Sequence, residues 1–453
     1  MNITQFTMEE VRCFAEPQTL EIRPLTFLVG ENSTGKTTAL SCFQVLVNYL
    51  VGGEVDFNQS PYSMGIFKDI VRNSKKKEKA FKLGFTFRGE SEDIECTVDF
   101  FQKKGGVEPT VEAITIKFVD GEVVLERSDH TRWDIGTPIV SSSEARGINA
   151  TTWREVPQMR LVSFDEAQNQ YCVDIASGFL DRTPFPFLFD YRIKKQSKGE
   201  SSLRNYLNKK EKQTGIVWGR FREDLSAFSV APIRSRPKRT YEPTREFYDP
   251  EGGDVPMHLL QVKINQKQQW ENLKQRLVEF GKRSGLFQNI EIKNLGGTMG
   301  NPFQLKVKVR GPNSNITDVG YGISQILPIL VNILDSPAFY RHSPTFLLQQ
   351  PEVHLHPRAQ AELSSLLVTS ANTSNRSFII ETHSDYMIDR ARIEIIKGNI
   401  RPEDVSLIYF EPNGRIVKVH NIGFDKMANM VGAPPNYGEF FLKESKRLLG
   451  FKD

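Results

Sequence analysis

Residues 19–51 have the sequence TLEIRPLTFLVGENSTGKTTALSCFQVLVNYLV, which combines two short apolar strands, a glycine-rich turn and an apolar helix. The turn from Gly30 to Thr37 fits the pattern G-x-x-x-x-G-K-[ST] in full. Its glycines let backbone N–H groups face a phosphate at the start of the helix, where the helix dipole favours an anion. In such loops the lysine, here Lys36, contacts phosphate oxygens, and the hydroxyl of Thr37 binds Mg²⁺. We therefore predict that the following residues bind ATP and Mg²⁺: Gly30, Asn32, Ser33, Thr34, Gly35, Lys36, Thr37 and Thr38.

The composition is that of a large, ordered protein without an extended charged surface. The chain has 453 residues, which predicts one elaborated domain or two to three lobes. With 59 basic and 55 acidic residues the net charge is +4, so any nucleic-acid site must be local. The N-terminal MNITQFTMEEVRCF lacks the features of a signal peptide, and no apolar run is long enough for a membrane span. The cysteines have no CxxC spacing, and we expect a cytoplasmic protein with reduced thiols and no zinc site.

Hydrophobic patterns divide the chain into three predicted regions of an α/β protein. Residues 1–164 contain the phosphate loop and a β-rich layer, because 79–101 and 111–126 alternate apolar and polar residues. Residues 165–225 are polar and rich in lysine, and we expect an inserted, mostly helical lobe over residues 165–299. In residues 300–453 short apolar strands alternate with amphipathic helices, which predicts a mostly parallel sheet covered on both faces.

A second functional segment is expected in TFLLQQPEVHLHP, residues 345–357. Proteins with a phosphate loop usually have acids at the end of a neighbouring strand, one to hold the metal and one to polarise water. This chain has Gln349 and Gln350 instead, followed by Glu352. A glutamine carbonyl binds a metal weakly and cannot act as a base, so hydrolysis through these positions should be slow. We predict Gln349 as a metal ligand and Gln350 and Glu352 as candidate catalytic residues.

The next apolar strand, in FIIETHSD (residues 378–385), ends in an acid that could compensate. Adjacent parallel strands place their carboxyl ends side by side, so Glu381 is predicted to face the γ-phosphate and to be a catalytic residue, as the base for the attacking water. The alternatives are a helix-capping or surface carboxylate. His383 follows two residues later, and its alternative is a histidine packed in the core.

The segment PEVHLHP resembles ABC-type ATPases of the overcoming-lysogenization-defect (OLD) and RecF-like group and their anti-phage relatives. The resemblance implies a P-loop ABC-type ATPase head, with His383 as the switch histidine that contacts the γ-phosphate. It also implies that DVGYGISQ, residues 318–325, is a signature that binds the nucleotide held by a second subunit. Glycines at the start of a helix expose backbone donors, which suits an anion, although a plain turn is the alternative. The signature residues predicted to contact nucleotide are Gly320, Gly322, Ser324 and Gln325.

The resemblance extends over most of the chain and is strongest to the ATPase subunits of the PARIS (AriA) and Septu (PtuA) defence systems. OLD nucleases carry a C-terminal Toprim domain, for which too few residues follow the last predicted strand. The resemblance therefore implies a free-standing sensor and scaffold ATPase. Its implied partners are further copies of itself, in a dimer of heads or a larger assembly such as a hexamer, a separate Toprim or HNH nuclease, and a phage protein as trigger.

Two other functions stay open at this point. One is a nucleotide-dependent scaffold that scarcely hydrolyses ATP, because both strand-end acids are glutamines. The other is a RecF- or Rad50-like DNA-repair ATPase, against which stands the lack of a long heptad pattern. The basic run from Arg234 to Arg239 could bind phosphate or a partner, or be a solvated face. Arg12 and Phe14, which precede the phosphate loop, are candidates for contact with the base. His354 and His356 could form a metal pair, with a structural role after the strand as the alternative.

Overall fold

The computed structural model describes residues 2–73, 79–119, 121–128, 158–164, 173–175, 209–215, 225–243, 248–296, 300–335, 345–374 and 376–438. The chain divides into two compact units. The first comprises residues 1–11, 45–56 and 66–222, and the second comprises residues 12–44, 57–65 and 223–453. Helix α1 (Lys36–Leu50) contributes its first nine residues to the second unit and its remainder to the first.

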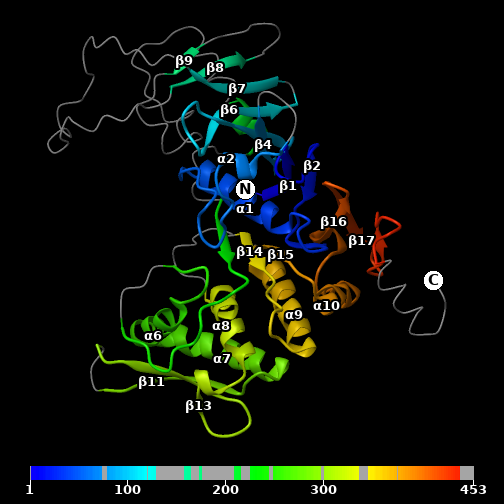
Figure 1. Ribbon diagram of the computed structural model, residues 1–453. Helices are drawn as coiled ribbons and strands as arrows, with labels where there is room; N and C mark the ends of the chain where they lie inside the picture. The colour runs from blue at the N-terminus through cyan, green and yellow to red at the C-terminus, as the bar shows by residue number, and fades with distance from the viewer. Residues whose placement is uncertain are drawn as a thin grey trace, which may run out of the picture. The chain divides into compact units, whose positions relative to one another are not determined.

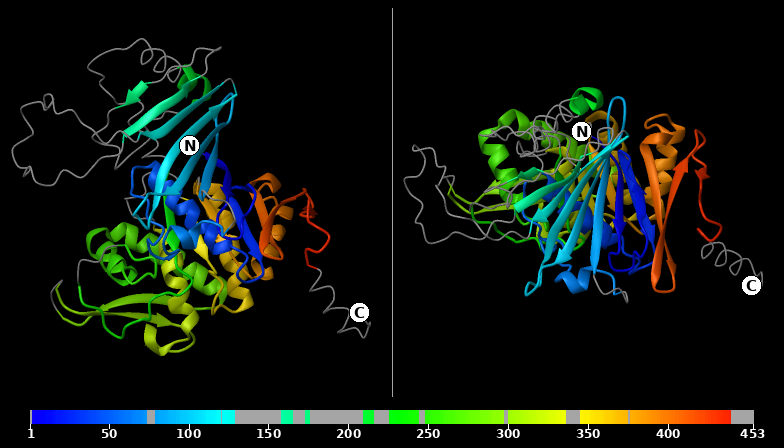
Figure 2. Two further views of the ribbon diagram at one scale, coloured as in Figure 1. Left: turned by 45° about the horizontal axis from the view of Figure 1, so that its top comes forward. Right: turned by 90° about the horizontal axis from the view of Figure 1, so that it is seen from above.

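The first unit contains an antiparallel sheet. Its strands follow one another in the order β1-β4-β5-β6-β7-β8-β9, and all of these pairs are antiparallel. Figure 2 shows these strands fanning out with a strong twist. Alternate side chains of β4 and β5 are buried, and the rings of Phe81 and Phe100 stack at 4.9 Å. The predicted β-rich layer is confirmed. The elements are β1 (Asn2–Glu9), α2 (Phe67–Ile70), β4 (Ala80–Arg88), β5 (Ile94–Gln102), β6 (Pro109–Phe118), β7 (Gly121–Ser128), β8 (Gln158–Phe164) and β9 (Val173–Ile175).

The second unit contains a mostly parallel sheet, as the sequence predicts. Within the described residues its strand order is β10-β14-β15-β3-β16-β17-β18, and the neighbours from β10 to β16 are parallel. The strands of this unit are β2 (Gln18–Glu21), β3 (Leu25–Gly30), β10 (Ala227–Val230), β14 (Thr345–Gln349), β15 (Ser377–Glu381), β16 (Val405–Asn413), β17 (Ile416–Phe424) and β18 (Met430–Val431). The central strands β3, β14 and β15 are apolar and almost wholly buried, as is typical of parallel strands that are covered on both faces.

Amphipathic helices and a small antiparallel sheet complete the second unit. In Figure 1, α6, α7 and α8 lie close to the sheet that contains β11 and β13. Helix α7 buries Trp270, Leu273, Leu277 and Phe280, a helical spacing, and ends at Gly285 in the left-handed conformation. The elements are α6 (Val255–Asn265), α7 (Lys267–Ser284), β11 (Asn289–Asn294), β12 (Phe303–Lys308), β13 (Ser314–Asn315), η2 (Ile316–Asp318), α8 (Tyr321–Leu334), α9 (Pro357–Ser374), α10 (Asp385–Ile396) and η3 (Pro402–Asp404). None of the described helices is long and apolar enough to cross a membrane.

The two units differ from the three regions predicted from the sequence. Residues 225–296 were expected in an inserted lobe, but they belong to the same unit as the C-terminal part of the chain. The reason is β10, a short buried strand that pairs with β14 and joins this stretch to the main sheet. Helices α6 and α7 agree with the expected helical content. Residues 165–172, 176–208 and 216–224 lie outside the described residues, so the rest of the predicted lobe stays a prediction.

The register of the parallel strands brings the predicted functional segments to one sheet edge. Gln349 at the end of β14 pairs with Glu381 at the end of β15, and Glu381 pairs with Leu28 of β3. Gly30, the last residue of β3, pairs with Phe410 of β16. The predicted proximity of the strand ends is confirmed, and this carboxyl edge is where open α/β sheets bind ligands.

Candidate functional site

The phosphate loop connects β3 to α1, and its two glycines are required by close contacts. Gly30 has φ +144°, and a Cβ there would lie 2.6 Å from the carbonyl oxygen of Phe410. Gly35 has φ +90°, and a Cβ there would lie 2.6 Å from Cζ of Phe14. Side chains at either position would collide with neighbours or strain the backbone. The loop can therefore keep its backbone N–H groups close to a bound phosphate.

The side chain of Lys36 folds back onto the phosphate loop. Its Nζ donates to the carbonyl oxygens of Gly30, at 3.0 Å, and Glu31, at 2.6 Å. Burial lowers the pKa of Lys36, while the negative charges of Glu381 and Glu31 oppose that shift. The two carbonyls hold the ammonium group at the loop, where a bound phosphate group could contact it.

Among the other predicted loop residues, two are exposed to solvent and two form hydrogen bonds within the protein. Asn32 and Ser33 are exposed, and Ser33 has φ +64°. The hydroxyl of Thr34 donates to the carbonyl oxygen of Glu31 at 2.8 Å, and Thr38 accepts from Arg12 at 3.2 Å. Their contact with nucleotide stays a prediction.

Glu381 is placed against Thr37. The Thr37 hydroxyl lies 2.8 Å from Oε2 and 3.1 Å from Oε1 of Glu381, to which it donates. Burial raises the pKa of Glu381, and the Thr37 hydrogen bond and the Lys36 charge act in the opposite direction. Carboxylate and hydroxyl oxygens are ligands that Mg²⁺ prefers, so Thr37 and Glu381 fit a magnesium ion. The alternatives of a capping or surface acid are wrong, since Glu381 is 6% exposed and bonded to the loop.

The two glutamines that replace the usual acids lie beside Glu381. Gln349 is buried and is the register partner of Glu381. Gln350 has φ +40°, and its N–H donates to the carbonyl oxygen of Glu381 at 2.8 Å. A chain turn at this point ties the end of β14 to the end of β15. Their roles as metal ligand and catalytic residue stay predictions.

Glu352 is engaged by the segment that follows Glu381. The backbone N–H of His383 donates to Oε1 of Glu352 at 2.8 Å, and Glu352 is only 8% exposed. Burial raises the pKa of Glu352. The side chain of His383 is exposed and lines a pocket together with Asp385 and Asp389, so it is not a core histidine. Burial and the Lys36 charge lower the pKa of His383, which favours the neutral imidazole at pH 7.

Arg234 is a site residue whose environment the sequence did not reveal. It follows β10, is 1% exposed, and its Nη2 lies 3.2 Å from the carbonyl oxygen of Gln349 and 3.4 Å from that of Gln350. Burial lowers its pKa to about 10, and the nearby Glu352 opposes that change. Arg234 therefore stabilises the turn after β14 by donating hydrogen bonds to its carbonyl oxygens. The signal in the sequence was weak, an arginine directly after the mostly apolar AFSVAPI, residues 227–233.

The signature segment forms the start of α8 as expected. A Cβ at Gly322 would lie 2.6 Å from the carbonyl oxygen of His354, whereas one at Gly320 would meet no described atom within 4 Å. The Ser324 hydroxyl donates to the carbonyl oxygen of Tyr321 at 2.8 Å, and Gln325 is buried. Gly322 thus has a packing role, and contact of the four signature residues with nucleotide stays a prediction.

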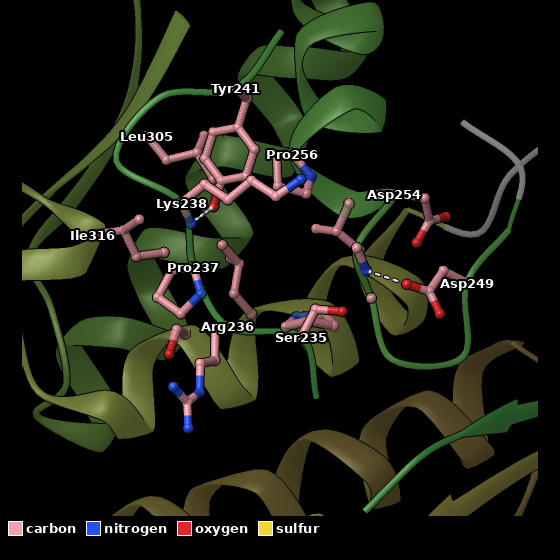
Figure 3. Close-up of a pocket in the computed structure, with 16 residues that line it drawn as sticks. Ser235, Arg236, Pro237, Lys238, Tyr241, Asp249, Asp254, Pro256, Leu305 and Ile316 are labelled. Atoms are coloured by element: carbon pink, nitrogen blue, oxygen red, sulfur yellow. Dashed lines mark hydrogen bonds between the residues drawn. The ribbon is translucent and has the colours of Figure 1, made fainter. Parts of the chain in front are cut away.

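The basic run next to the signature is divided among three environments. Arg234 is buried, Arg239 forms an ion pair with Asp318, and Arg236 and Lys238 line a pocket of about 330 Å³. Figure 3 shows this pocket, where the ring of Tyr241 and the side chain of Lys238 lie on one side and Asp249 and Asp254 on the other. The run is therefore not a continuous cationic surface of the kind that tracks a nucleic-acid backbone.

The weaker candidates have mostly structural surroundings. Phe14 is fully buried against Phe410, which is incompatible with stacking on a base. The ring of His354 packs edge-on against Tyr321 at 5.1 Å. Nδ1 of His356 accepts from the N–H of Arg358 at 3.3 Å, at the start of α9. The two histidines have separate contacts.

Comparisons with known proteins agree with a nucleotide-hydrolysing domain. Residues 238–388, about a third of the chain, match the AAA ATPase domain family. This part contains the signature, β14 and β15. Together with the phosphate loop and the parallel sheet, the match defines the protein as an ATPase with a P-loop and a mixed α/β head.

Solved structures of SMC heads align with the chain at low identity. The SMC head bound to the C-winged helix domain of ScpA has 11% identity, covers 94% of this chain and 99% of its own, and has a TM-score of 0.47. The SMC head domain from Thermotoga maritima has 10% identity, coverage of 92% and 98%, and a TM-score of 0.38. The Smc head with an extended coiled coil bound to the C-terminal domain of ScpA, from Pyrococcus furiosus, has 11% identity, coverage of 98% and 99%, and a TM-score of 0.43. No curated protein matches the sequence.

Proposed function

We propose that this ATPase binds ATP and Mg²⁺ between two copies of itself, with the phosphate loop of one head and the signature of another on opposite sides of the nucleotide. The observation that carries the proposal is the phosphate loop with Lys36 beneath it and Glu381 bonded to Thr37. The open space at Gly320 supports a role for the start of α8 in contacting a second head. Backbone N–H groups at a helix start suit the negative charge of a γ-phosphate.

Hydrolysis at this site should be slow. Gln349 and Gln350 cannot accept a proton from water, and the carboxylate of Glu352 accepts from the backbone of His383. His383 has the exposure and the lowered pKa of a group that could accept a hydrogen bond from water or contact the γ-phosphate. The same observations favour the second candidate function, a scaffold that binds ATP to assemble and scarcely turns it over.

In the cell, the protein would act in the cytoplasm as the sensor and scaffold of an anti-phage defence complex. Bound ATP would hold the heads together, and a phage protein would trigger release or activation of a separate Toprim or HNH nuclease. The support is the resemblance of the signature, QQPEVHLHP and ETHSD segments to the ATPase subunits of such systems. The DNA-repair alternative is less well supported, because Arg234 and Arg239 are engaged within the protein.

Three measurements on the same samples test the proposal: ATP affinity, ATP turnover and oligomer mass, for wild type and Lys36→Ala. Wild type should bind ATP·Mg²⁺ and gain mass with it, and Lys36→Ala should lose both. Turnover separates the two candidates, since an ATPase gives steady release of phosphate and a scaffold gives assembly without it. A wild-type protein that neither binds ATP nor changes mass with it would exclude both. Phage plating on cells that carry the gene with its neighbouring reading frames tests the defence role.

A further inference from the structure

We infer that Glu381 supplies the carboxylate ligand of the magnesium ion that accompanies ATP, in place of the acid missing at Gln349. The inference rests on the proposed ATP·Mg²⁺ site and assigns a different role to Glu381 from that of a catalytic base. It concerns which strand of the sheet carries the metal-binding acid.

The contact between Glu381 and Thr37 is the first observation. In phosphate loops the hydroxyl at the position of Thr37 is a magnesium ligand. Both carboxylate oxygens of Glu381 lie within 3.1 Å of this hydroxyl, so the carboxylate is within reach of an ion bound there. A general base must instead accept a hydrogen bond from the attacking water, whereas both oxygens of Glu381 contact the loop hydroxyl.

The sheet register is the second observation. Gln349 and Glu381 are direct Cα partners on β14 and β15, and neighbouring strands lie about 4.8 Å apart. Strand β15 also pairs with β3, whose end leads into the phosphate loop. The acid therefore stands at the end of β15, next to β3, and not at the end of β14, where Gln349 replaces the usual acid. Both positions lie at the same edge of the sheet.

The burial of Glu381 is the third observation. Glu381 is only 6% exposed, and its carboxylate faces the hydroxyl of Thr37. A buried carboxylate is costly in the free protein, and a divalent cation would compensate its charge. A buried acid at this place is therefore expected of a metal ligand.

The test measures how much Mg²⁺ strengthens binding of a fluorescent ATP analogue, with Mn²⁺ electron paramagnetic resonance as a direct report of the bound ion. In wild type, Mg²⁺ should tighten nucleotide binding. In Glu381→Gln, affinity for the analogue without metal should equal or exceed that of wild type, because one negative charge beside the phosphates is removed, and this also shows that the site is folded. The strengthening of binding by Mg²⁺ should fall by roughly tenfold or more. Adding Gln349→Asp to Glu381→Gln should restore the Mg²⁺ effect and the Mn²⁺ signal, because it returns an acid to the partner strand. Glu394→Gln, which changes a buried acid of α10 outside the site, is the matched control and should keep the wild-type effect of Mg²⁺ on nucleotide binding.

Two results would overturn the inference and are distinct. If Glu381→Gln binds ATP·Mg²⁺ as tightly as wild type and loses only turnover, Glu381 is the base and the metal ligand lies elsewhere. If wild type binds no nucleotide with or without metal, the proposed function fails and this inference fails with it.

Discussion

Glu381 illustrates at the scale of one residue how a binding site lowers the stability of the free protein. Burial raises its pKa, so the folded state favours the protonated acid more than the unfolded state does. The stability that this provides is present below the ordinary pKa of glutamate and is lost as the pH rises through the raised value. Ionised Glu381 is therefore a cost at pH 7, and Glu381→Gln should raise the Tm of the nucleotide-free protein by a few degrees there. The gain should shrink toward pH 4, as measured by thermal unfolding across pH.

Glu394 is a control for Glu381, because its pKa is shifted in the opposite direction. Burial acts to raise its pKa, but hydrogen bonds from Asn399, Ser365 and Lys397 outweigh that effect and lower it. Its contribution to stability is present above the ordinary pKa and is lost as the pH falls through the lowered value. Glu394→Gln should therefore lower Tm at pH 7, by an amount that declines in acid. If Glu381→Gln fails to raise Tm at pH 7, the electrostatic explanation for Glu381 is wrong.

At the scale of one element, the two glycines of the signature, Gly320 and Gly322, have different surroundings. Gly322→Ala would place a Cβ 2.6 Å from the carbonyl oxygen of His354, so α8 or the turn after β14 must move. We expect a loss of about 1–3 kcal/mol in the free energy of unfolding. Gly320→Ala meets open space and should unfold like wild type. Denaturant titration of the pair checks this, and equal stability of the two variants would contradict the packing role of Gly322.

The turn after β14 depends on a second element, the loop that carries Arg234. Arg234→Met removes a buried donor from the carbonyls of Gln349 and Gln350 and leaves Glu352 without its nearest compensating charge. We expect a loss of about 1–3 kcal/mol in stability and a weaker Mg²⁺ effect on ATP binding. The exposed neighbour Arg236 offers the matched control, Arg236→Met, which should stay within about 0.5 kcal/mol of wild type. A wild-type unfolding midpoint for Arg234→Met would show that the turn holds without it.

Elements with a strong local pattern were predictable, and those fixed by distant pairing were not. The strands of residues 19–30, helix α1, and the strands and helices from α8 to β16 follow from apolar periodicity and from the glycines of the loop. Strand β10 is four residues long and was expected within a helical lobe, because only its pairing with β14, more than 100 residues later, makes it a strand. The burial of Arg234 could not be predicted for the same reason, because it depends on contact with Gln349, which is also more than 100 residues later. Because neighbouring parallel strands end at the same edge of a sheet, the sequence predicted that Glu381 lies near Gln349. It could not predict that Glu381 contacts Thr37.

At the scale of the whole molecule, the proposed composite site makes a prediction that no single variant can test. Lys36→Ala removes the phosphate-binding lysine, and Gly320→Arg places a long cationic side chain where α8 begins and where the structure has room for it. Each variant alone should lack ATP turnover or, for a scaffold, ATP-dependent assembly. In a head-to-tail dimer, mixing the two gives heterodimers in which one site combines an intact loop from one chain with an intact signature from the other. An equal mixture should therefore recover about a quarter of the wild-type sites. A chain that carries both substitutions, mixed with either single variant, cannot form an intact site and is the control. Recovery in that control, or none in the first mixture despite folded variants, would show that each head binds and uses ATP without the signature of a partner.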